Sequence, residues 1–192
     1  MSTGTVHLHR VLRAPPERVY RAFVEPSAMV KWLPPHGYTA EVHHMDVRVG
    51  GGVRMSFTHF ASGQRHSFGG DYLELVPGKR LRYTDTFDDP NLPGTMTTTV
   101  TLRPVACGTE LSIVQEGIPE MIPVEMCQLG WQESLALLWR GVSLTELFLY
   151  WSGDERGSAY RACPLDFPIC VPVGSQFPHG AGHGDAEHAL AA

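Results

Sequence analysis

Residues 46–52 read D-V-R-V-G-G-G, a stretch that ends in three consecutive glycines. Glycine permits positive φ and a close approach of the backbone, as a tight hairpin or a bulge requires. A phosphate-binding loop would need glycines that lead into a helix, whereas the residues after Gly52 have the composition of a strand. The stretch therefore predicts a turn between two strands, at residues 38–48 and 53–60.

Further strands are predicted on both sides of this turn, with two short helices on the upstream side. Upstream, a strand is predicted at residues 5–13, and two short helices follow it before Pro34. Pro16 can begin the first of these helices and Pro26 ends it, because proline fits the first turn but not the interior. Downstream, further strands separated by turn signals are predicted at residues 66–76, 79–88, 95–102 and 109–116.

A helical pattern replaces the alternation over residues 122–150. Trp131 begins a stripe of apolar side chains that is wider than packing on one flat surface requires, so we expect the helix to be buried on more than one side. The absence of a side chain at Gly130 is expected to let this helix approach the sheet closely. The stripe is formed by Trp131, Leu135, Leu138, Val142 and Leu149.

Composition sets the class of the protein. The chain has 192 residues, 43% of them hydrophobic, and a net charge of −5, which is typical of a globular protein and argues against a nucleic-acid binder. No apolar run is long enough for a membrane span, and the first residues lack the apolar segment of a signal peptide, so we expect a cytoplasmic protein. Four cysteines without C-x-x-C spacing are expected to be free thiols.

The chain divides into two regions by composition. Residues 1–151 are predicted to form one domain. Residues 152–192 are rich in Gly, Pro, His and Ala without a sustained period, and we expect a mostly disordered tail.

Short motifs in a common order run through residues 5–150. They are Arg10, Ala14–Tyr20 with Ala22 and Phe23, Trp32–Pro34, Asp46–Gly51, Gly70–Tyr72, Gly108–Leu111, and Gly130–Trp131 with Leu135. Together they resemble the SRPBCC superfamily, which includes the START and pollen-allergen-type domains. Within it the resemblance is to the AHSA-like branch, related to the activator of the heat-shock-chaperone ATPase.

This resemblance implies an α+β helix-grip fold. A curved antiparallel sheet would wrap around one long C-terminal helix, with two short helices after the first strand. The superfamily often encloses a cavity between sheet and helix, but it shares no catalytic residues and no cofactor that could be carried over to this chain.

We expect that cavity to be the functional site. Ligand pockets are mostly apolar and contain a few placed polar groups. The residues predicted to line it are Trp32, Tyr38, Phe57, His66, Phe68, Arg82, Tyr83, Asp85, Phe87, Trp131, Leu135 and Trp139.

Asp85 is the candidate for acid–base chemistry. Strand alternation places it on one face with Tyr83 and Phe87, and a carboxylate among aromatics would have a raised pKa. If the opposite parity holds, Asp85 is solvated, and the sequence leaves both open. His59, His66, Asp71, Arg82 and Glu116 are the other ionisable residues on strands that could face inward. No histidine or cysteine spacing predicts a metal site.

Three functions compete on this fold. The first is binding of a small hydrophobic or aromatic molecule in the cavity. The second is an enzyme of the cyclase, dehydratase or hydrolase type that uses the same cavity, and a carboxylate or histidine with a polar partner across the pocket would favour it. The third is a co-chaperone or protein-interaction role, which an exposed apolar patch would favour. A homodimer is left open.

Overall fold

Seven antiparallel strands form one sheet in the part of the chain that the computed structural model describes, residues 4–149 with side chains up to Ser143. Their order across the sheet is β1-β7-β6-β5-β4-β3-β2. The predicted tail at 152–192 lies outside the described residues. The strands are β1 (Gly4–Leu12), β2 (Tyr38–Met45), β3 (Gly52–His59), β4 (Arg65–Val76), β5 (Arg80–Phe87), β6 (Met96–Val105) and β7 (Gly108–Ile118).

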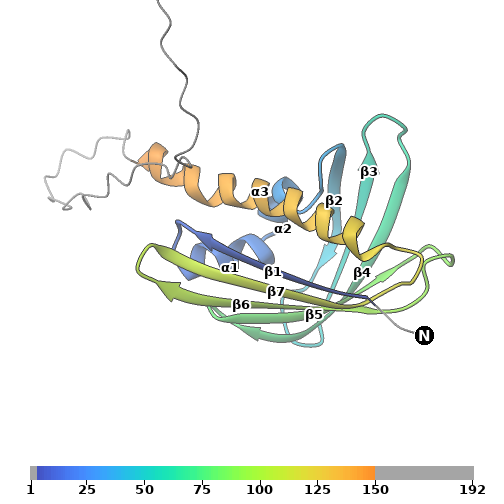
Figure 1. Cartoon of the computed structure of the whole chain (residues 1–192), viewed down its shortest axis with the longest axis horizontal. Coiled ribbons are helices and arrows are strands. Elements are labelled where there is room, and N and C mark those ends of the chain that lie inside the picture. Colours follow the sequence, from blue (N-terminus) through green and yellow to red (C-terminus); the bar gives the residue numbers. More distant parts are fainter. Residues whose placement is uncertain (1–3, 150–192) are drawn as a thin grey trace, which may run out of the picture. The chain divides into compact units, whose positions relative to one another are not determined.

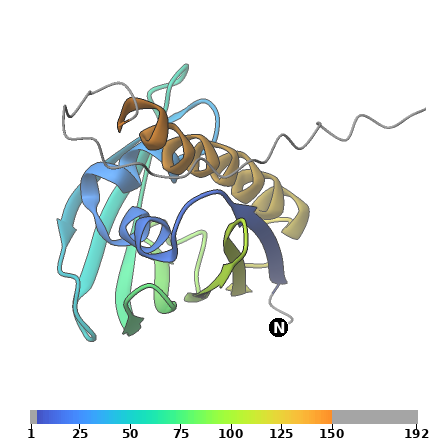
Figure 2. The ribbon, with the colours of Figure 1, turned by 90° about the vertical axis from the view of Figure 1, so that its left-hand side faces the viewer.

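Three helices accompany the sheet in the described residues. The short helix α1 (Pro16–Val24) begins at Pro16, as predicted, and Pro26, which was expected only to end it, also begins α2 (Pro26–Trp32). The long helix α3 (Val124–Leu149) is one uninterrupted helix of 26 residues. Figure 1 shows α3 lying along the concave side of the sheet. Figure 2, turned by 90°, shows the sheet curving around it. The predicted helix-grip fold is thus confirmed.

Glycines allow the sheet to turn and bend at two places. Gly50 has a φ of +77°, and a side chain at Gly51 would collide with the carbonyl oxygen of Asp46, so the hairpin between β2 and β3 needs both glycines. In β4, a side chain at Gly70 would collide with the backbone of Thr84 on β5. The strands meet there more closely than any residue with a Cβ allows, beside a register shift that follows Tyr72.

The long helix serves two regions of the interior. Its middle and later residues, among them Leu135, Leu138 and Val142, are buried in a core formed with α1 and with β1, β6 and β7. Arg18 of α1 donates a hydrogen bond to the carbonyl of Val142 at 3.2 Å, which ties the two helices together. The first half of α3 instead lies over the cavity described below.

The role expected for Gly130 is corrected by the structure. No atom lies within 4 Å of the place where its Cβ would be, so the glycine does not bring the helix onto the sheet. It lies instead at the wall of the cavity. Within the described residues, none of the helices has the length and apolar character needed to cross a lipid bilayer.

Candidate functional site

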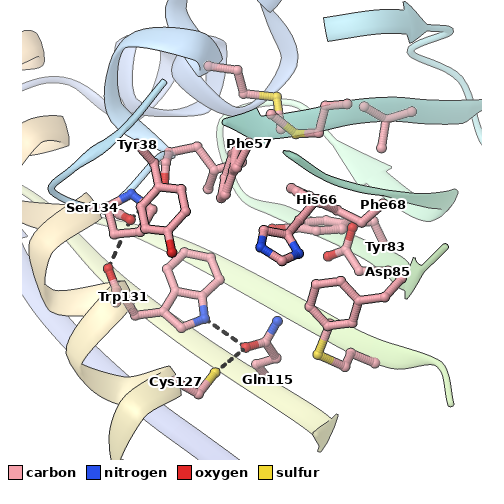
Figure 3. Close-up of a pocket in the computed structure, with 18 of the residues that line it drawn as sticks. Tyr38, Phe57, His66, Phe68, Tyr83, Asp85, Gln115, Cys127, Trp131 and Ser134 are labelled. Atoms are coloured by element: carbon pink, nitrogen blue, oxygen red, sulfur yellow. Dashed lines mark hydrogen bonds between the residues drawn. The ribbon is translucent and has the colours of Figure 1, made fainter. Parts of the chain in front are cut away.

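A cavity of about 390 Å³ lies between the concave face of the sheet and the first half of α3. Side chains from both short helices, from strands β2 to β7 and from α3 surround it, and most of them are apolar. Figure 3 shows how the labelled side chains converge on it. The lining consists of Phe23, Met29, Trp32, Leu33, Pro35, Tyr38, Val53, Met55, Phe57, His66, Phe68, Tyr72, Tyr83, Asp85, Phe87, Leu92, Met96, Gln115, Ile122, Met126, Cys127, Gly130, Trp131 and Ser134.

Strand alternation and register build the aromatic wall on the sheet side. On β5, Tyr83, Asp85 and Phe87 share the concave face, which settles the parity that the sequence left open. Phe87 pairs with Phe68 on β4, and their ring centroids are 6.0 Å apart. Phe68 in turn meets Phe57 edge to face at 4.9 Å. Such edge contacts fix the rings in place, so this wall is preformed.

Hydrogen bonds to Gln115 fix α3, on one side of the cavity, to strand β7 on the other side. The side-chain oxygen of Gln115 on β7 accepts hydrogen bonds from Trp131 Nε1 at 2.8 Å and from Cys127 Sγ at 3.1 Å. The amide nitrogen of Gln115 donates to Thr98 Oγ1 at 3.3 Å. Because Gln115 is buried, these bonds are shielded from water and hold the first half of α3 at a set distance from the sheet.

A second contact holds the same helix to the loop that follows α2. Ser134 Oγ lies 2.6 Å from the carbonyl oxygen of Leu33 and 2.9 Å from that of Gly130. On the opposite side of the loop, Trp32 donates from its indole nitrogen to the carbonyl of Ala22 at 2.8 Å. The loop and the helix thus form a fixed rim around the cavity.

The most unusual polar group of the lining is the carboxyl of Asp85. It is only 9% exposed, and burial raises its pKa to about 7, because its charged form would lose hydration. Among the side chains of residues 4–143, none donates a hydrogen bond to this carboxyl. His66 of β4 also points into the pocket, near Asp85 in the view of Figure 3.

The tyrosines next to Asp85 are held in their neutral form. Burial, with a smaller effect from the charge of Asp85, raises the pKa of Tyr72 to about 12 and that of Tyr83 well above its usual value. The hydroxyl of Tyr72 is buried without a hydrogen-bond partner within the described residues. The mostly apolar lining therefore contains one carboxyl beside two buried tyrosines, and its other polar side chains are Tyr38, His66, Gln115, Cys127 and Ser134.

The thiol of Cys127 does not have the surroundings of a nucleophile. Burial raises its pKa, and the partner that its Sγ has in the described residues is the amide oxygen of Gln115, which is not a base. Within the described chain, no group of three or more His, Cys, Asp or Glu residues is placed to hold a metal ion.

Most of the residues predicted for the cavity come together in it. The lining includes the predicted Trp32, Tyr38, Phe57, His66, Phe68, Tyr83, Asp85, Phe87 and Trp131. Three others do not line it, and their predicted places are corrected here: Arg82, Leu135 and Trp139.

Each of these three corrections has a geometric reason. Arg82 directly precedes Tyr83, so it points to the opposite, convex face of the sheet and is exposed. Leu135 is fully buried in the core beyond the end of the cavity. At 100° per residue, Trp139 lies about 80° around the helix from Trp131. It therefore faces away from the cavity, and it is 48% exposed.

Sequence reasoning missed several lining residues, of which Gln115 matters most. The candidate on β7 was Glu116, which is exposed, as is Asp71 on β4. The alternation of Leu111 and Ile113 in fact places Gln115 on the inner face, so strand parity was a signal that could have found it. For Met29 and Ile122, nothing in the sequence pattern distinguishes a residue that lines a cavity from one that is packed in the core.

A family profile matches the greater part of the chain. The family described as "Activator of Hsp90 ATPase homolog 1-like protein" matches residues 13–140. Among solved structures, a protein of Chromobacterium violaceum is 64% identical, with a TM-score of 0.71, and the match covers 72% of this chain and 96% of that one.

More distant solved structures share the fold. A protein of Rhodobacter sphaeroides is 22% identical, with a TM-score of 0.64 over 76% of this chain and 98% of that chain. A protein of Nitrosomonas europaea is 23% identical, with a TM-score of 0.63 over 73% of this chain and 95% of that chain. At these identities the likeness concerns the fold alone.

Two curated proteins match a short segment only. They are the pyruvate dehydrogenase E1 component subunits alpha of Mycoplasma genitalium and Mycoplasma pneumoniae, each 42% identical over 52 residues. The match spans 27% of this chain and 14% of each of those proteins. Their activity is therefore not carried over.

Proposed function

This chain belongs to the family of activator of Hsp90 ATPase homolog 1-like proteins, and we propose that it binds a small, mostly apolar or aromatic molecule in the cavity beneath α3. The observation that carries the proposal is the cavity itself. Its volume of about 390 Å³ falls in the usual range of ligand pockets, roughly 300–1,000 Å³. Its aromatic walls with a single buried carboxyl match the composition of such pockets.

The way in which the chain keeps this space open supports the proposal. Protein interiors are close-packed, and a cavity lowers stability because its lining loses packing contacts. Gly130 faces the cavity although alanine would fit there and would favour the helix by about 1 kcal/mol. A chain selected for stability alone would fill this position.

Native mass spectrometry of freshly purified protein tests the proposal. The wild-type protein should carry a bound small molecule that denaturation releases. Gly130→Leu places a side chain into the cavity, and the bound mass should be lost. Gly141→Leu is the matched control, because Gly141 lies in the same helix, is exposed, and also has open space where its Cβ would be. If both variants keep the bound mass, the ligand site lies elsewhere.

A catalytic function in the same cavity is the second candidate, and Asp85 is the observation that favours it. A carboxyl with a pKa of about 7 could remove a proton from a bound substrate near neutral pH. Catalytic bases are commonly oriented by a polar partner, and none contacts the Asp85 carboxyl within the described residues. Incubating the recovered ligand with wild-type protein and with Asp85→Asn would decide, because only turnover that depends on Asp85 supports an enzyme.

A chaperone-binding role is a further alternative, suggested by the family description. Met126 and Leu129 lie three residues apart on α3 and are exposed, 61% and 49%, so they could contribute to an apolar contact surface. A pull-down with Hsp90, with Leu129→Ser as the contrasting variant, tests this role separately from ligand binding, because Leu129 does not line the cavity.

A further inference from the structure

We propose that the ligand of this cavity carries a basic nitrogen and that this nitrogen binds, as a cation, to the carboxylate of Asp85. The inference rests on the proposed function, since it names the chemical class of the ligand for the same cavity. Asp85 is an ionisable side chain that is buried in a mostly apolar pocket.

Asp85 is a buried acid without a counterpart. Its side chain comes from the middle of the concave face, where β5 pairs with β6 at Met96, and it points into the cavity. The residue is 9% exposed, and no side chain of residues 4–143 forms an ion pair or a hydrogen bond with its carboxyl. Buried polar groups are almost always paired, so an unpaired one in a pocket points to a partner that the ligand supplies.

None of the groups around Asp85 forms a hydrogen bond or an ion pair with its carboxyl in the described residues. The lining contains no lysine and no arginine. Tyr72 on β4 and Tyr83 on β5 are neutral near pH 7, as tyrosine ordinarily is, and burial raises their pKa values further. The remaining titratable groups of the lining are Tyr38 on β2, His66 on β4 and Cys127 on α3, and Tyr20 on α1 lies close enough to Tyr72 to affect its pKa. None of them is hydrogen-bonded to Asp85.

A cationic ligand would fit both features of the cavity. An ammonium or amidinium group forms a charge-assisted hydrogen bond with a carboxylate, which is stronger than a bond from a neutral hydroxyl. The rings of Phe68, Phe87 and Tyr83 line the same cavity as Asp85, and aromatic faces attract cations in a desolvated site. An anionic ligand would instead be repelled by the carboxylate.

The ligand's charge also has a consequence for pH. A cation binds the ionised form of Asp85, and this form becomes more populated as the pH rises through about 7. The affinity for an amine should therefore increase between pH 6 and pH 8, while the amine itself stays protonated. The affinity for a neutral ligand of the same shape should not increase.

Three probes of matched shape test the inference by isothermal titration calorimetry: 2-phenylethylamine, 2-phenylethanol and 3-phenylpropanoate. At pH 8, the amine should bind the wild-type protein about tenfold more tightly than the alcohol, and the carboxylate should bind most weakly. Asp85→Asn should remove the preference for the amine and leave the alcohol within about threefold of wild type. Asp71→Asn is the charge-matched control, because Asp71 is an exposed carboxylate on β4.

Several outcomes would overturn the inference. Equal affinities of wild-type protein for amine and alcohol, or an amine preference that survives in Asp85→Asn, would show that Asp85 does not bind a cation. The amine affinity of the wild-type protein, measured from pH 6 to pH 8, tests the inference without any variant. An affinity that does not increase would overturn the inference even if Asp85→Asn failed to fold. If the alcohol binds and the amine does not, only the inference fails. If none of the probes binds, the proposed function fails with it.

Discussion

Replacing Asp85 with asparagine should make the protein more stable, and increasingly so as the pH rises. The folded protein holds the Asp85 proton up to a pH of about 7, whereas the unfolded chain loses it near the ordinary value of 3.8. Between these two values the unfolded state binds fewer protons than the folded state, so rising pH favours unfolding. Below this window the effect is absent, and above it the effect is complete.

The size of the effect follows from the width of the window. Each pH unit contributes about 1.4 kcal/mol, so the full penalty on the wild-type protein is about 4 kcal/mol. Between pH 5 and pH 8 the wild-type protein should lose about 2 to 3 kcal/mol relative to Asp85→Asn. In a domain of this size that corresponds to a relative shift in melting temperature of roughly 4 to 12 °C.

Urea denaturation of both proteins at half-unit steps from pH 5 to pH 9 measures this difference. Ionisable groups that are common to both proteins and distant from Asp85 cancel in the comparison. The buried amide of the variant can have a cost of its own, but that cost does not depend on pH. A constant difference between the two proteins across the whole range would show that Asp85 is solvated and would refute its burial in the apolar lining, on which the reasoning depends.

Three further predictions follow from the packing. Gly130→Leu and Gly141→Leu should each stabilise the protein by roughly 0.5–1 kcal/mol in thermal denaturation, because leucine favours a helix more than glycine does. A loss of stability in Gly130→Leu would show that the cavity cannot accept a side chain. Trp131→Ala should cost about 3–5 kcal/mol by chemical denaturation and Trp139→Ala less than about 1 kcal/mol, and equal losses would mean that the helix is rotated from the position described. Gly70→Ala should cost more than about 2 kcal/mol, because its Cβ would meet the backbone of Thr84, and a melting temperature within 2 °C of wild type would contradict that close contact.

The fold could be predicted from the sequence because apolar residues recur with the period of a strand or of a helix over long segments of the chain. Alternation along strands such as β6, where Met96, Val100 and Leu102 are buried, specifies which residues face the core. The helical stripe from Trp131 to Val142 specifies the buried side of α3 in the same way. Proline and glycine at Pro16, Pro26 and Gly50 mark where the elements begin and turn.

The details of the site depend on three-dimensional contacts that these patterns do not contain. Arg82 could have been set aside by parity once Tyr83 was placed, because neighbours on a strand point to opposite faces. Leu135 could not, since the sequence does not show where along α3 the cavity ends and the core begins. The space around Gly130 depends on the distance between helix and sheet, which the Gln115 hydrogen bonds fix.

The indole N–H signals in a ¹H–¹⁵N NMR spectrum test the central claim, ligand binding in the cavity, most directly. Trp131 lines the cavity and its indole N–H is bonded to Gln115, whereas Trp139 lies on the same helix and is 48% exposed outside the lining. Substitution of each tryptophan by phenylalanine assigns the signals. On titration with 2-phenylethylamine or 2-phenylethanol to saturation, the account predicts that the Trp131 signal shifts and that the Trp139 signal stays in place. Saturable binding that leaves the Trp131 signal unmoved would contradict it.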